Sequence, residues 1–128
     1  MAKTKVQYEY NMHCLSEILY EYLASAEGLS EWFADDVVER GDDFFFSWGN
    51  SPAEKATMIR YKPESFVRFR WEEDEGSKYF FELSIVIDEI TDDLSLNITD
   101  FCEPGDEEEN QLYWENLIEN LQLKLGAS

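Results

Sequence analysis

The stretch that decides the fold is EEENQLYWENLIENLQLKL, residues Glu107–Leu125. Acids at its start and Lys124 near its end suit the two poles of a helix dipole, and Gly126 suits its stop. Such a helix is about 28 Å long at about 1.5 Å per residue, enough to cross a small domain. At helical spacing one stripe is formed by Asn110, Tyr113, Trp114, Leu117, Leu121 and Leu125.

The chain before this helix is mostly a series of short strands. Lys3–Met12 alternates between apolar and polar residues, as a half-buried strand does. Turn residues recur about every ten positions after residue 35, which is typical of an antiparallel meander. The six further strands predicted are Asp36–Arg40, Asp43–Trp48, Ala53–Lys62, Ser65–Glu72, Tyr79–Ile87 and Leu94–Phe101.

Two short helices are predicted between the first and second strands. They cover Ser16–Ala24 and Leu29–Phe33, and Ala26-Glu27-Gly28 is expected to separate them. Because apolar faces must be buried against one another, the elements predict an α+β fold. In it a seven-stranded antiparallel sheet curls around the long C-terminal helix, and residues 1–128 form a single domain.

One strand leaves its inward face undecided. In Ala53–Lys62, Met58 shares its face with Arg60, whereas Ile59 shares its face with Tyr61. Either pair could face the helix.

The charge balance narrows the classes of partner. Ten basic and 29 acidic residues give a formal net charge of −19. The electrostatic field of so negative a protein repels phosphate backbones and anionic lipids, so no nucleic acid is expected as a partner. No apolar run is long enough to span a bilayer, so membrane insertion is not expected either. The acidity is explained by a solvated surface, and the alternative is a basic protein partner.

Residues suited to catalysis or metal binding are scarce. His13 is the single histidine, which argues against histidine triads and multi-histidine metal sites. No nucleotide-binding glycine motif is present, so no cofactor, catalytic residue or metal ligand is predicted, and enzymatic activity is not indicated. Cys14 and Cys102 lack CxxC spacing and are expected to be free thiols, which fits a reducing cytoplasm.

Four segments resemble a known family in order and spacing. They are ASAEGLSEWF (Ala24–Phe33), YKPE (Tyr61–Glu64), VRFRW (Val67–Trp71) and WENLIENL (Trp114–Leu121). Together they resemble the activator-of-heat-shock-ATPase-like proteins of the START-like superfamily. The resemblance implies the helix-grip fold, in which a seven-stranded sheet curls about the last helix.

Large aromatic residues come from elements expected to converge between the sheet and this helix. Such rings can fill a core, and the resemblance implies that they can line an apolar cavity there. Arg60 and Tyr113, if they point inward, would be its polar groups. The residues predicted to line the cavity are Trp32, Phe33, Phe46, Trp48, Met58, Arg60, Phe69, Trp71, Phe81, Tyr113, Trp114 and Leu117.

Two functions from different classes follow. The first is non-enzymatic binding of a small hydrophobic ligand, lipid-like or polycyclic, in a cavity between the sheet and the C-terminal helix. The second is an acidic protein-interaction module with a filled core, which the resemblance implies could be chaperone-related.

Overall fold

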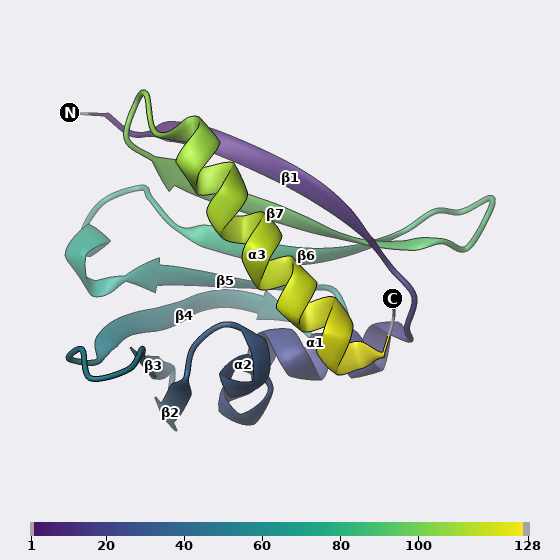
Figure 1. Ribbon diagram of the computed structural model, residues 1–128, viewed down its shortest axis with the longest axis horizontal. Helices are drawn as coiled ribbons and strands as arrows, with labels where there is room; N and C mark the ends of the chain where they lie inside the picture. The colour runs from purple at the N-terminus through teal and green to yellow at the C-terminus, as the bar shows by residue number, and fades with distance from the viewer. Residues whose placement is uncertain (1, 127–128) are drawn as a thin grey trace.

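The strands of the computed structural model, which describes residues 2–126, form one curled antiparallel sheet (Figure 1). The sheet has seven strands in the order β1-β7-β6-β5-β4-β3-β2. The elements in chain order are β1 (Thr4–Met12), α1 (Ser16–Ala24), α2 (Ala26–Trp32), β2 (Asp36–Arg40), β3 (Asp43–Ser47), β4 (Glu54–Lys62), β5 (Phe66–Trp71), the short 3₁₀ helix η1 (Glu72–Asp74), β6 (Phe81–Ile87), β7 (Leu94–Cys102) and α3 (Glu107–Leu125). The predicted α+β class, strand number and helix order are confirmed.

The strand order combines a meander with one long-range pairing. From β2 to β7 every strand pairs with its neighbour in the sequence, whereas β1 pairs with β7. That pairing runs from Thr4 opposite Cys102 to Met12 opposite Leu94. The N-terminal strand therefore forms one edge of the sheet and β2 forms the other.

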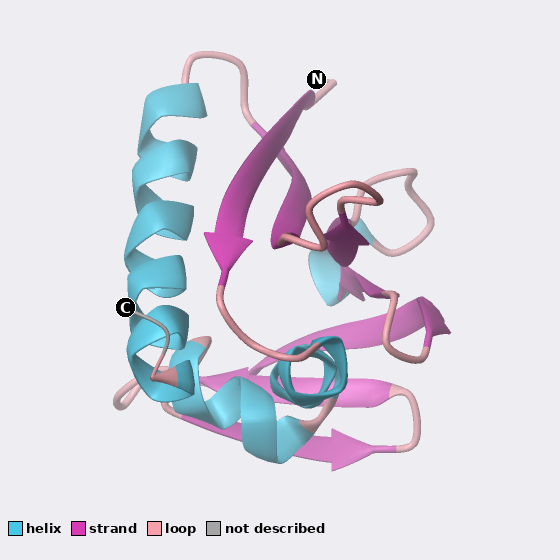
Figure 2. Cartoon of the chain, turned by 90° about the vertical axis from the view of Figure 1, so that its right-hand side faces the viewer, coloured by secondary structure: helices cyan, strands magenta, loops and turns pink. Residues whose placement is uncertain are grey.

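Helix α3 crosses one face of the sheet (Figure 1), and in a view turned by 90° it stands as a separate layer beside the strands (Figure 2). Its buried residues are Trp114, Ile118 and Leu121, at steps of four and three. Ile118 was missing from the predicted stripe. Tyr113 is 44% exposed, because the buried face is centred on Trp114 and Ile118.

The ends of α3 are those that the sequence predicts. Its first turn holds the acids Glu107–Glu109, its last turn holds Lys124, and Gly126 has a φ of 68°. That left-handed conformation favours glycine, and the Gly126 N–H donates to the carbonyls of Gln122 and Leu123. The helix therefore stops at the predicted position.

The boundary between the two short helices differs from the prediction. Helix α2 begins at Ala26 rather than Leu29, and the break lies at Ser25, whose Oγ accepts a hydrogen bond from the Gly28 N–H. Gly28 lies inside α2, where a Cβ atom would be 2.2 Å from the Glu21 carbonyl oxygen. Its missing side chain allows α2 to approach α1 closely and does not end a helix.

A β-bulge in β4 resolves the face that the sequence left open. Met58 pairs with Phe69, but Arg60 pairs with Arg68, so the register shifts between them at Ile59. Phe69 is fully buried, and Met58 opposite it packs against the core. Arg60 does not share the face of Met58 and is exposed, so the expectation that it points inward is wrong.

Candidate functional site

Five aromatic side chains meet between the sheet and α3, and we call them the ring cluster: Phe33, Phe46, Phe69, Phe81 and Trp114. Each is at most 2% exposed. Phe33 is at the centre, with ring centroids 5.2 Å from Phe46, 5.5 Å from Phe81 and 5.9 Å from Trp114. Rings at these distances are in contact, so they fill the space between the helix and the sheet at this level.

A partly buried polar network holds Trp114 in place. The Trp114 Nε1–H donates to Asp100 Oδ2 over 2.9 Å, and the Asn110 Nδ2–H donates to the same oxygen over 3.0 Å. The Tyr8 hydroxyl donates to Asn110 Oδ1 over 2.7 Å. These bonds connect α3 to both β7 and β1.

Asp100 is the ionisable centre of this network. Desolvation raises the pKa of its carboxyl, while the hydrogen bonds from Asn110 and Trp114 oppose the rise without cancelling it. Desolvation also raises the pKa of the Tyr8 hydroxyl to about 12. The sequence pattern missed Asp100, because an acid that ends an alternating strand is normally on the surface.

Two tryptophans lie at the rim of the ring cluster. Trp48 and Trp71 are each half-buried, and their ring centroids are 6.4 Å apart at an interplanar angle of 48°. The Trp48 Nε1–H donates to the Phe33 carbonyl oxygen over 3.0 Å, which fixes its indole beside the cluster. The rim therefore has a defined aromatic wall.

One hollow beside this wall lies between α2, the end of β3 and α3, and we call it the helix groove. Its volume is about 320 Å³ and it is open to solvent. Four of its residues are predicted site residues: Trp32, Phe33, Trp48 and Leu117. The others are Ser30, Glu31, Ala34, Asp35 and Asn120.

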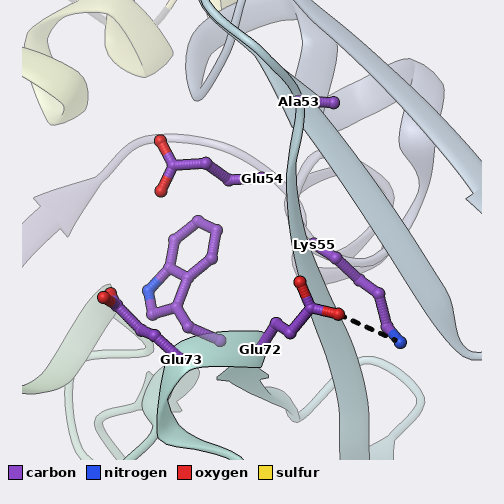
Figure 3. Close-up of a pocket in the computed structure, with 6 residues that line it drawn as sticks. Ala53, Glu54, Lys55, Glu72 and Glu73 are labelled. Atoms are coloured by element: carbon purple, nitrogen blue, oxygen red, sulfur yellow. Dashed lines mark ion pairs between the residues drawn. The ribbon is translucent and has the colours of Figure 1, made fainter.

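A second hollow, the Trp71 groove, lies on the other side of Trp48. It consists of two adjoining depressions of about 170 and 380 Å³ that share Glu54, Trp71 and Glu73. Trp48 and Tyr113 complete one depression, and Ala53, Lys55 and Glu72 complete the other. Figure 3 shows the Glu72 side chain turned toward Lys55, at 3.8 Å, whereas Glu54 and Glu73 point away from that lysine.

Tyr113 belongs to the wall of the Trp71 groove. Desolvation, followed by the negative charges of Asp100 and Glu54, raises the pKa of its hydroxyl to about 12. Since 44% of the residue is exposed, water screens part of this effect. The hydroxyl is nevertheless a neutral hydrogen-bonding group at physiological pH.

The predicted site residues thus divide into three groups. The ring cluster and Trp32 are buried, Trp48, Met58, Trp71 and Leu117 are half-buried, and Arg60 and Tyr113 are exposed. Met58 and Arg60 line neither groove. Sequence reasoning did not foresee Glu54 and Glu73 as groove residues, because Glu54 is a single acid and Glu73 belongs to an acidic run, Glu72–Glu75, that is typical of a solvated loop.

Within residues 2–126, no three or more histidine, cysteine or acidic side chains are grouped so that they could hold a metal ion. No helix of the same range has the length and apolarity needed to cross a membrane.

Comparison with known protein families shows to which family this architecture belongs. The family model described as START-like superfamily domain matches residues 1–127. The chain belongs to the START-like superfamily. The comparison with curated proteins gave no match.

Solved structures share this START-like fold. A Bacteroides fragilis protein solved by NMR is 31% identical, with 97% of this chain and 92% of that chain covered and a TM-score of 0.68. The Aha1 dimer from Colwellia psychrerythraea is 14% identical, with 95% and 96% covered and a TM-score of 0.77. DynU16, described as a putative protein in the dynemicin biosynthetic locus, is 15% identical, with 96% and 48% covered and a TM-score of 0.74.

Proposed function

We propose that this START-like domain binds a small apolar ligand without catalysing a reaction, and that the ligand lies along α3 against Trp48. The observation that carries the proposal is the position of Trp48, which lines the helix groove and the Trp71 groove at once. Since the ring cluster fills the interior, the ligand site is at the rim of the cluster.

The helix groove offers both apolar and polar surface to a ligand. Trp48 and Leu117, which are half-buried, supply the accessible apolar part, because Trp32 and Phe33 are only 3% and 1% exposed. Polar residues such as Ser30 and Asn120 lie around it. Sites for small molecules are mostly apolar, with a few polar groups that fix orientation, and measure about 300–1,000 Å³. The helix groove, at about 320 Å³, is at the lower end of that range.

Catalysis is not part of the proposal. His13 is exposed and lines neither groove. The residues that line the grooves include carboxylates. Among these lining residues, no nucleophile paired with a general base lies next to a carboxylate. We further propose a single domain over residues 1–128 and a cytoplasmic location, which the two free thiols Cys14 and Cys102 support.

Titration with 2-naphthol, a neutral bicyclic probe, tests the ligand site. We expect the indole N–H resonance of Trp48 to shift in ¹H–¹⁵N spectra and Trp48→Leu to weaken binding at least tenfold. Tyr61→Leu is the matched control, since Tyr61 is 58% exposed and lines neither groove. An unshifted Trp48 resonance, or equal binding by Trp48→Leu, would overturn the proposal.

The acidic surface favours a second candidate, an interaction module for a basic protein. The first turn of α3 presents the exposed acids Glu107–Glu109, and among the salt bridges of residues 2–126 none involves them. Pull-downs in about 0.1 M and 1 M salt test it, because the Debye length falls from about 10 Å to 3 Å over that range. A charge-driven partner is released at high salt, and capture that is independent of salt contradicts this candidate.

A further inference from the structure

We propose that the Trp71 groove binds an organic ammonium group, so that the ligand is an apolar amine whose cationic end lies between the aromatic rings and the carboxylates of this groove. The inference rests on the proposed function, because it assigns the charge of the same ligand.

The aromatic side chains supply one half of the recognition. Trp48, Trp71 and Tyr113 line one depression of the groove. Tryptophan is the aromatic side chain that attracts a cation most strongly over its ring face, and the attraction grows as water is excluded. Both tryptophans are half-buried, so each is supported by the core and still partly accessible.

The carboxylates supply the other half. Glu54 and Glu73 line both depressions of the groove. In the part of the chain that the structure describes, neither side chain takes part in a salt bridge or a side-chain hydrogen bond. The Lys3 ammonium also interacts with the charge of Glu73, although its ion pair is with Asp74. A cation in the groove would therefore meet two carboxylates that make no direct ion pair with a basic side chain.

The one basic residue lining the groove is already engaged. Lys55 Nζ lies 3.9 Å from Asp43 Oδ2 and 3.8 Å from Glu72 Oε2. Its ammonium is thus held between Asp43 and Glu72, as the ion pair drawn in Figure 3 shows for Glu72. Glu54 and Glu73 remain available to a ligand.

An organic cation suits the groove better than a metal ion. Within residues 2–126, no cluster of three or more potential ligands is close enough to hold a metal. Hard metal cations need several oxygen ligands, whereas an alkylated ammonium is weakly hydrated and gains from ring faces. The combination of three rings with two carboxylates therefore matches an alkylammonium.

Choline and 3,3-dimethylbutan-1-ol form the test pair, since the alcohol has carbon in place of the charged nitrogen. In about 0.15 M salt, where the Debye length is about 8 Å, we expect choline to bind at least fivefold more tightly. Its binding should shift the indole N–H resonances of Trp48 and Trp71. The indole of Trp114 donates to Asp100 and lines neither groove, so it serves as the internal reference.

Charge variants separate this site from general attraction by an acidic protein. Glu54→Gln with Glu73→Gln should weaken choline binding at least fivefold. Glu89→Gln with Asp93→Asn removes the same charge from the exposed β6–β7 turn, at the opposite end of the molecule from η1 (Figure 1), and should leave binding unchanged.

Two results would overturn the inference: equal binding of choline and the alcohol, or equal weakening by the two double variants. If 2-naphthol still shifts Trp48 in that case, the proposed function stands and only the ligand charge is wrong. If 2-naphthol fails while choline binds with the expected variant pattern, the apolar site is wrong and the ammonium site is supported.

Discussion

The ring cluster and the Trp71 groove both contain large aromatic side chains, yet the environments of these rings are opposite. In the ring cluster every large ring is at most 2% exposed and contacts other rings. In the groove, Trp48 and Trp71 are half-buried and Tyr113 is 44% exposed, with carboxylates beside them. Some of these aromatic side chains therefore fill the core, and others form a solvent-accessible wall.

Helix α3 contains the sharpest form of this contrast in two consecutive residues. Trp114 is 2% exposed and its indole N–H is bonded to Asp100, while Tyr113 points to the groove and has no such bond among the described residues. Their rings touch, with centroids 5.6 Å apart. A truncation of Trp114 acts mainly on the interior and one of Tyr113 mainly on the groove, although the contact between the rings couples the two.

Removal of the buried ring should have the largest effect. Trp114→Ala empties a site between Phe33 and Phe81 and leaves Asp100 with one hydrogen bond fewer, so it should reduce the free energy of unfolding by about 3–5 kcal/mol. Urea denaturation measures it. Glu119→Ala, exposed on the same helix, should stay within about 0.5 kcal/mol. Equal midpoints for the two variants would show that α3 does not bury this face.

The close approach of α2 to α1 at Gly28 positions residues of both the ring cluster and the rim. In Gly28→Ala the new Cβ would meet the backbone of Glu21 and Tyr22 at 2.2 and 2.6 Å, so α2 must move. We expect a loss of about 1–3 kcal/mol, as for other overpacked sites. Because α2 carries Trp32 and ends at Phe33, the Trp48 indole resonance should also shift. Ser30→Ala in the same helix is the control, and equal stability of the two variants would contradict the close approach.

Asp100 gives the stability of the interior a pH dependence. Its pKa is raised in the folded state above the ordinary value of 3.8, so the folded state holds its proton more tightly than the unfolded state. The contribution of Asp100 to stability therefore falls as pH rises from 3.8 through the raised pKa.

Asp100→Asn removes this titration and keeps an oxygen acceptor. The stability of the parent protein minus that of the variant should decline as pH rises from about 3.8 to 7, measured by urea denaturation at each pH. Asp88→Asn is the opposite control, because hydrogen bonds from Thr91 and Ile90 lower the pKa of Asp88. A difference that grows with pH for Asp100→Asn would contradict the desolvated site.

Truncation at the rim should have the smallest effect on stability. Tyr113→Ala removes a ring that is 44% exposed, so we expect a loss of about 1 kcal/mol. The same variant should weaken choline binding, whereas Leu112→Ala, at a neighbouring exposed position, should not. If Tyr113→Ala destabilises as much as Trp114→Ala, the division into interior and rim is wrong.

The fold could be predicted because its signals are periodic and local. Alternation in β1, regular turns and the caps of α3 each specify an element without knowledge of the others. The break between α1 and α2 was misplaced because Gly28 was taken for a helix breaker, whereas it allows two backbones to approach. Ser25, which caps α2, carries the correct signal.

The candidate site was only partly predictable. The sequence predicted most of the aromatic residues that converge but missed Phe44, which is 1% exposed and contacts Phe69. It could not separate Trp114 from Trp71 by burial, because both lie on inward positions. The bulge at Ile59, which turns Arg60 away from the face of Met58, follows from sheet register and has no marker in the sequence. Glu54 and Glu73 belong to the candidate site because they lie beside Trp71. This proximity arises from the tertiary structure, so the sequence pattern does not reveal it.

The pairing of β1 with β7 affects the order in which the chain folds. Strands β2 to β7 can pair one hairpin at a time. In contrast, the pairing of Thr4 with Cys102 joins residues separated in sequence by most of the chain. Contacts so distant in sequence form slowly because the loop must close before they stabilise anything. During synthesis, at about 5–20 residues per second, β1 therefore waits several seconds without its only sheet neighbour. Tyr8 and Tyr10, half-buried in the finished sheet, are then available to other unpaired strands.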